Sequence, residues 1–290
     1  MIAPARDVSG TLRPGASRAR SQRRALVGGL ALCGLLAAGC RRAEPPDPWR
    51  TALQAHLEHG VAALALAPAV PNSGAVWSLQ HLYPQREPRI DALIARSIAA
   101  QGADPTARLN TPALPPPAIP ADPGRGVVRL SRYLQAPYGT PTERAAGFLR
   151  DFLSTPGDGY ILTHQLLALQ WSEQFGVIPP RAAAALRAPL VERLLAEQRT
   201  APANFSDLYA ERVALLLALT SVPQAEIDAW LATITTAQHD DGRWVDDGVS
   251  PLAYDGQQAA AQHDWTHTSA HAVTALALAL RARAPTPASR

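Results

Sequence analysis

Three side chains that could bind a metal ion or move protons lie at the starts of apolar segments in the second half of the chain. They are His164, Glu211 and His267. Two imidazoles and one carboxylate form a ligand set that suits Zn²⁺, or Fe²⁺ with open coordination positions. The positive end of a helix favours the neutral imidazole that binds metal. If these helix starts converge, the three residues form a candidate site in which a metal, Zn²⁺ first among them, could be held.

Further polar residues lie close to these three in the sequence. His271 follows His267 by one helical turn, so it could replace or support a metal ligand. Asp264 and Tyr160 are the candidate acid and base, and Asp158 could orient a ligating imidazole by accepting its second N–H. The alternative is structural: each of these residues could be a helix cap or a hydrogen-bonded polar group inside a packed core.

The elements that would position these residues are helices. Strand signals are nearly absent, and the apolar spacing and capping residues predict helices over 49–66, 75–82, 88–101, 127–135, 141–154, 160–175, 180–199, 206–220, 223–238 and 264–283. Ser206 and Thr163 are expected to supply or flank N-cap oxygens at two helix starts. Prolines at 179, 180 and 223 suit first turns. The fold class expected from the sequence is therefore all-α.

The three chemistry-bearing segments share a layout that suggests a repeat. Each begins with a polar turn and continues as an apolar run with little amphipathic contrast, which is typical of a helix surrounded by other helices. More amphipathic segments, such as 180–199 and 223–238, lie between them. Glu211 follows His164 by 47 residues (211 − 164), and His267 follows Glu211 by 56 (267 − 211). This spacing predicts an array of helical hairpins with inner and outer members.

The segment that runs from Gln238 through His-Asp-Asp-Gly-Arg to Trp244, with Trp230 just before it, resembles the Gln-Trp motif of terpene cyclases and related α/α-toroid proteins. The resemblance implies that Gln238 caps an outer helix and stacks beside Trp244. It also implies that the next helix, over 268–280, is an inner one. The start Asp-Gly-Tyr-Ile-Leu-Thr-His at 158–164, with Glu211 and His267 later, is similar to an uncharacterised bacterial toroid family over about residues 140–282. The expected fold is an incomplete α/α toroid whose inner-helix starts meet.

The departures from these families bear on activity. Class II terpene cyclases protonate their substrate with an Asp-x-Asp-Asp acid, which neither Asp240-Asp241 nor Asp246-Asp247 spells. Protein prenyltransferases resemble the chain at His267, where they have a Zn²⁺-ligand histidine, but they also need a cysteine ligand. Fold similarity alone does not transfer activity.

The N-terminus resembles the export signal of bacterial lipoproteins. Arg23-Arg24 precede a short apolar run over 25–39 that ends in Leu-Ala-Ala-Gly before Cys40, and this run is shorter than the ~20 residues of a membrane-spanning helix. The resemblance implies cleavage before Cys40 and acylation of its sulfur, which would anchor the protein to a membrane. Arg41 favours the periplasmic face of the outer membrane. An ordinary secretory signal, cut after Gly39 and leaving Cys40 unmodified, is the alternative, and the Sec and twin-arginine routes both stay open.

The expected organisation follows from these features. It comprises a signal peptide over 1–39, a tether over 40–48, an N-terminal helical region over 49–102, a Pro-rich linker over 103–126, the toroid-like domain over 127–283 and a tail over 284–290. Cys33 would be discarded and Cys40 acylated, so the mature domain would have no thiol. The chain also lacks lysine, which excludes Schiff-base chemistry and a phosphate-loop lysine.

The basic character of the chain belongs to the signal. The formal charge is +3 and the isoelectric point is about 9.2, but six arginines and one acid precede residue 40. The remainder has 27 − 6 = 21 arginines and 24 − 1 = 23 acids, a net charge of −2. No nucleic-acid partner is therefore expected.

The sequence favours an envelope lipoprotein that presents a polar cavity to a small or peptide ligand, with the membrane as its other partner through Cys40. Whether it is an enzyme stays open. The alternatives are a metal-dependent hydrolase or lyase with a His/Glu/His site, and a structural envelope protein without a ligand.

Overall fold

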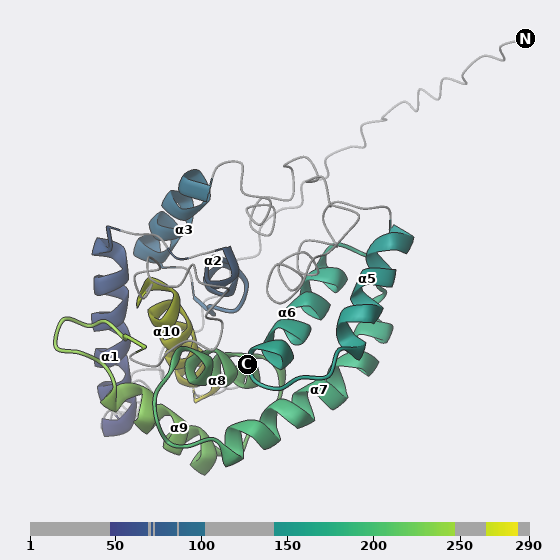
Figure 1. The fold of residues 1–290 in the computed structure, drawn as a ribbon. Coiled ribbons are helices and arrows are strands. Elements are labelled where there is room, and N and C mark those ends of the chain that lie inside the picture. The colour runs from purple at the N-terminus through teal and green to yellow at the C-terminus, as the bar shows by residue number, and fades with distance from the viewer. Residues whose placement is uncertain are drawn as a thin grey trace, which may run out of the picture. The chain divides into compact units, whose positions relative to one another are not determined.

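A computed structural model describes residues 47–68, 71, 73–85, 87–101, 142–246 and 265–283. Every regular element in these ranges is an α-helix, so the all-α prediction is confirmed. All of them belong to one compact unit, Pro46–Arg290. In chain order the helices (Figure 1) are α1 (Pro48–Leu66), α2 (Ser73–His81), α3 (Pro88–Gln101), α5 (Thr142–Ser154), α6 (Tyr160–Gln174), α7 (Pro180–Thr200), α8 (Asp207–Leu219), α9 (Gln224–Thr236) and α10 (Trp265–Ala282).

The bounds of these helices lie within two residues of those expected from the sequence, and local capping explains several of them. The Ser206 hydroxyl accepts the N–H of Tyr209 at 3.1 Å and so begins α8 as expected. Asp47 caps α1 in the same way, with the Trp49 N–H 3.0 Å from its carboxylate. The expected N-cap role of Thr163 is wrong. Helix α6 begins three residues earlier, after Gly159, which has no side chain to cap it.

Three helices, α6, α8 and α10, are buried on nearly all sides, as their apolar segments predict. In α10 every residue from Thr268 to Leu280 is buried. This helix packs against α1, α2, α8 and α9, while α6 packs against α5, α7 and α8 (Figure 1). Because these helices have neighbours on several sides, their polar residues also lie inside the molecule.

The four helices α2, α10, α8 and α6 are connected in a closed series of contacts. Helix α10 packs against α2 and α8, and α8 packs against α6. The series closes at Trp77 of α2, whose indole N–H donates to the Gln174 side chain of α6 at 3.0 Å. The Trp77 ring also meets the Trp171 ring edge to face, with centroids 5.9 Å apart. The toroid itself stays a prediction.

The turn between α9 and α10 is tied to α1 through the motif residues. The Gln238 amide donates to the carbonyls of His56 and Gly242, both at 3.0 Å, and its oxygen lies 2.6 Å from Nδ1 of His56. Trp244 is fully buried and donates its indole N–H to the Ile234 carbonyl at 2.7 Å. Gln238 therefore joins the turn to α1 by hydrogen bonds, while the Trp244 ring packs between α1 and α10.

Several expectations fall outside the described residues. They are the signal peptide over 1–39, the lipidated Cys40, the Pro-rich linker over 103–126, the helix over 127–135, the candidate acid Asp264 and the tail over 284–290. Among the described helices, none is both long and apolar enough to cross a membrane.

Candidate functional site

The polar site is centred on Asp207, the first residue of α8, which is only 7% exposed. Its Oδ2 accepts the Tyr160 hydroxyl of α6 at 2.9 Å and lies 3.3 Å from Nε2 of His267 in α10. Its Oδ1 accepts the Thr268 hydroxyl of α10 at 2.9 Å. One carboxylate therefore holds together the starts of three helices that are far apart in sequence.

Local structure fixes the direction of the Asp207 side chain. Ser206 caps α8, so Asp207 occupies the first turn, where the helix dipole stabilises a negative charge. The Asp207 N–H is bound in turn by the carboxylate of Asp246, at 3.1 Å. Hydrogen bonds thus fix both the backbone N–H and the side-chain carboxylate of Asp207.

The charge of Asp207 is stabilised despite its burial. Burial by itself would raise the pKa of this carboxyl, but the neighbouring His267 and His271 and the Tyr160 hydroxyl outweigh it and hold the pKa well below its usual value. Burial, followed by the negative charge of Asp207, raises the pKa of the Tyr160 hydroxyl far above its ordinary range. Tyr160 is therefore a hydrogen-bond donor to Asp207 at neutral pH, and the phenolate is disfavoured.

Glu211 lies one turn further into α8 and is more deeply buried, with 2% of its surface exposed. The pKa of the Glu211 carboxyl is raised, and burial is the main cause. The charge of Asp207 also raises this pKa, whereas His164 and His267 lower it. Among the residues that the structure describes, no hydrogen-bond partner reaches the Oε2 atom of Glu211. The carboxyl of Glu211 is thus a buried acceptor with an unfilled position.

The two histidines of α10 are in contact with each other at the site. The rings of His267 and His271 meet edge to face with centroids 4.7 Å apart. Burial, reinforced by His267, lowers the pKa of His271 from the ordinary 6.5 to about 3. His271 is therefore neutral at physiological pH, and His267, whose side chain is 22% exposed, lies nearer the solvent.

His164 approaches the site from α6. Its Nδ1 atom lies 2.6 Å from the Tyr160 carbonyl oxygen one turn earlier. The rings of His164 and Tyr160 meet edge to face, with their centroids 6.0 Å apart. Its charge, when present, acts on both Glu211 and His271. The hydrogen bond to the backbone fixes the orientation of the ring.

The structure thus gathers five of the residues singled out in the sequence, namely Tyr160, His164, Glu211, His267 and His271. Asp158 instead has a largely exposed side chain and pairs with Arg193 at 3.3 Å. Within the described ranges, no group of three His, Cys, Asp or Glu side chains has an arrangement that could hold a metal ion. The residues present therefore do not fit a metal as they stand, and the metal role stays a prediction.

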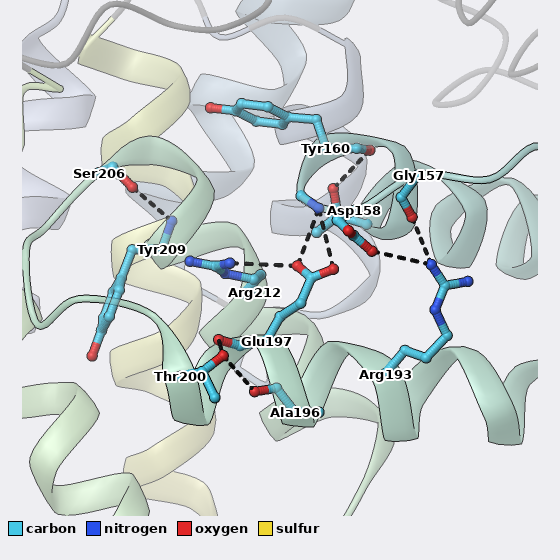
Figure 2. Close-up of polar contacts among 12 residues, drawn as sticks. Gly157, Asp158, Tyr160, Arg193, Ala196, Glu197, Thr200, Ser206, Tyr209 and Arg212 are labelled. Carbon is cyan, nitrogen blue, oxygen red and sulfur yellow. Dashed lines mark hydrogen bonds and ion pairs between the residues drawn. The ribbon is translucent and has the colours of Figure 1, made fainter.

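Helix α6 is held against the site by Glu197 of α7. Its carboxylate accepts the Gly159 N–H at 3.1 and 3.3 Å and lies 3.5 Å from the guanidinium of Arg212 in α8. Figure 2 shows Glu197 reaching from α7 between the start of α6 and Arg212, with the Tyr160 ring extending away from it. Gly159 has φ of +60°, a conformation that favours glycine. Glu197 thereby fixes the turn that aims Tyr160 at Asp207.

The sequence interpretation missed Asp207 and Glu197 as site residues. Asp207 was visible only as the acid that follows the cap at Ser206, which is an ordinary position for an acidic residue. Glu197 lies on an amphipathic helix among other charged residues and carries no signal of its own. Both owe their roles to contacts across 38 or more residues.

Comparison with protein-family models, curated proteins and solved structures finds no match to this chain.

Proposed function

We propose that the protein is a lipid-anchored envelope protein that binds a small ligand at the cluster formed by Tyr160, His164, Asp207, Glu211, His267 and His271. The observation that carries the proposal is the burial of several ionisable side chains, drawn from α6, α8 and α10, at one place. Burying such groups costs free energy that apolar residues of similar size would not require. This cost favours a binding role over a purely structural one.

The side chains of the cluster differ in their exposure to solvent. The His267 side chain is 22% exposed and that of Asp207 is 11% exposed, whereas Glu211 and His271 are almost completely buried. A ligand would therefore meet His267 first and Glu211 last. The anchoring part of the proposal depends on acylation of Cys40, and the toroid arrangement would supply the frame for the binding site.

One observation supports the alternative hypothesis of a metal-dependent hydrolase or lyase. The Asp207 carboxylate holds the His267 imidazole, and metal-binding histidines commonly have a carboxylate on their second nitrogen. A metal site would require His164, Glu211, His267 and His271 to adopt an arrangement that the described residues do not have. The present arrangement of these residues gives the enzyme the weaker support.

Two measurements on the full chain test the proposal. Cys40→Ser should abolish the acyl label and move the protein to the soluble fraction, whereas Cys33→Ser should change neither. Metal analysis of the purified protein should find no stoichiometric ion. A tightly bound metal that disappears in both His164→Ala and His267→Ala would replace the binding role with the enzymatic one.

A further inference from the structure

At two of the three helix starts at the site, a backbone N–H is already occupied by a carboxylate of the chain itself. Helix N-termini attract anions because their first N–H groups are unpaired and carry partial positive charge. At α6 the Gly159 N–H is taken by Glu197, at 3.1 Å. At α8 the Asp207 N–H is taken by Asp246, at 3.1 Å. An anionic ligand would have to displace one of these carboxylates.

The acidic groups at the cluster come from α8 and from the turn after α9. Asp207, Glu211 and Asp246 are the carboxyl groups, and the remaining titratable groups are Tyr160 and the imidazoles of His164, His267 and His271. The guanidinium of Arg212 in α8 pairs with Glu197 of α7 (Figure 2). Within the part of the chain that the structure describes, the side-chain contacts of Asp207 come from hydroxyl and imidazole groups, and the site presents an acidic environment.

The two buried carboxyls of α8 differ in how they are satisfied. Asp207 receives three side-chain contacts, from Tyr160, Thr268 and His267. Glu211 is 98% buried, and within the described part of the chain its Oε2 atom receives no hydrogen bond. A buried acceptor without a donor has lost its hydrogen bonds to water without replacement, and a donor delivered by a ligand would recover that free energy.

We infer that the site takes a small organic cation, whose ammonium group donates a hydrogen bond to Oε2 of Glu211. The inference rests on the proposed binding function and names the class of its ligand. An ammonium group supplies both the missing donor and the opposite charge, and the nearby charge of Asp207 adds to the attraction. A cation would enter past the partly exposed His267 and leave the carboxylates on the helix starts in place.

Three four-carbon probes of matched length test this inference on the full chain. They are 1,4-diaminobutane, 1,4-butanediol and succinate, and their effect on the melting temperature is measured as each is titrated. Binding to the native state alone raises the melting temperature with the logarithm of the ligand concentration above the dissociation constant. We expect stabilisation by the diamine, which added salt weakens, and none by the diol or succinate.

Variants locate the effect at Glu211. Glu211→Gln should weaken diamine binding at least tenfold, while Glu192→Gln, the same charge change on the exposed face of α7, should leave it unchanged. Glu211→Asp, which withdraws the carboxylate by one methylene, gives a second test if the first variant does not fold. Circular dichroism establishes the fold of each.

The possible failures are distinguishable. Stabilisation by succinate or the diol that is lost in His267→Ala would overturn the cationic ligand but leave a binding function at the cluster. No stabilisation by the diamine, or one equally strong in a folded Glu211→Gln variant, overturns the inference. Loss of the proposed function itself would require that no probe binds and that His267→Ala and Glu211→Gln match the wild type in every titration.

Discussion

Two buried polar regions of this molecule are satisfied in different ways. At the turn after α9, every polar atom of the Gln238 and Trp244 side chains has a hydrogen-bond partner. At the starts of α6, α8 and α10, Asp207 is saturated, but Glu211 is buried with one oxygen that no described residue reaches. A fully satisfied set of neutral groups fixes packing, whereas an ionisable group with an unfilled position is what a ligand could complete.

The largest loss of stability is expected from a substitution in the turn after α9. Trp244→Ala should lower the free energy of unfolding by about 3–5 kcal/mol, because the indole is fully buried between α1 and α10. Urea unfolding followed by circular dichroism measures the loss. Trp244→Phe, which keeps most of the apolar contact, should cost clearly less, and equal costs for the two variants would contradict a packing role.

The second effect is a loss of stability in acid that originates at the polar cluster. The pKa of His271 is about 3 in the folded protein and near 6.5 unfolded, so the unfolded state binds the proton first. Stability is therefore full above pH 6.5 and falls as the pH drops toward 3, by a few kcal/mol at about 1.4 kcal/mol per pKa unit. The lowered pKa of Asp207 extends the loss below pH 4, while the raised pKa of Glu211 acts in the opposite direction.

Urea unfolding at a series of pH values checks this dependence. His271→Gln should flatten the fall between pH 6.5 and 4. The exposed His239→Gln should leave it unchanged. An unaltered slope in the His271 variant would assign the acid sensitivity to other groups.

A smaller loss of stability is expected from a substitution at Gly159, where Glu197 of α7 binds the start of α6. Gly159→Ala should cost about 1–2 kcal/mol, because φ of +60° disfavours a Cβ atom, which would also lie 3.2 Å from the Leu208 side chain. Gly147→Ala is the matched control, since a Cβ atom there meets nothing within 4 Å. Thermal unfolding compares the two, and equal melting temperatures would show that the turn tolerates the side chain.

The smallest change in stability is expected from a substitution at Glu211, in contrast to the large change expected at Trp244. Glu211→Met should change the free energy of unfolding by less than about 1 kcal/mol, because it removes a buried carboxyl that lacks a full set of partners. The same variant should lose binding of 1,4-diaminobutane. A loss of several kcal/mol, measured by urea unfolding, would instead make Glu211 a structural residue like Trp244.

The sequence predicted the helices well because their signals are local. Apolar spacing, the cap at Ser206 and the prolines at 180 and 223 each act within a turn or two of the helix that they define. The exception was Thr163, whose hydroxyl looked like a cap but bonds instead to the Tyr160 carbonyl within the helix.

The candidate site was predicted in part. His164, Glu211 and His267 stood out because ionisable residues are unusual at the starts of apolar segments, and the structure gathers them. Asp207 and Glu197 could not be singled out, since acids near helix starts and on amphipathic helices are common. Their roles come from contacts between helices, which no local pattern encodes.

The central position of α10 has a consequence for the biosynthesis of the chain. Helix α10 covers faces of α1, α2, α8 and α9, yet it leaves the ribosome after all four of these helices. A chain that stops before residue 265 leaves apolar surfaces uncovered on all four neighbours. Such fragments are good substrates for proteases and prone to aggregation, so only a polypeptide that includes α10 can become resistant to degradation.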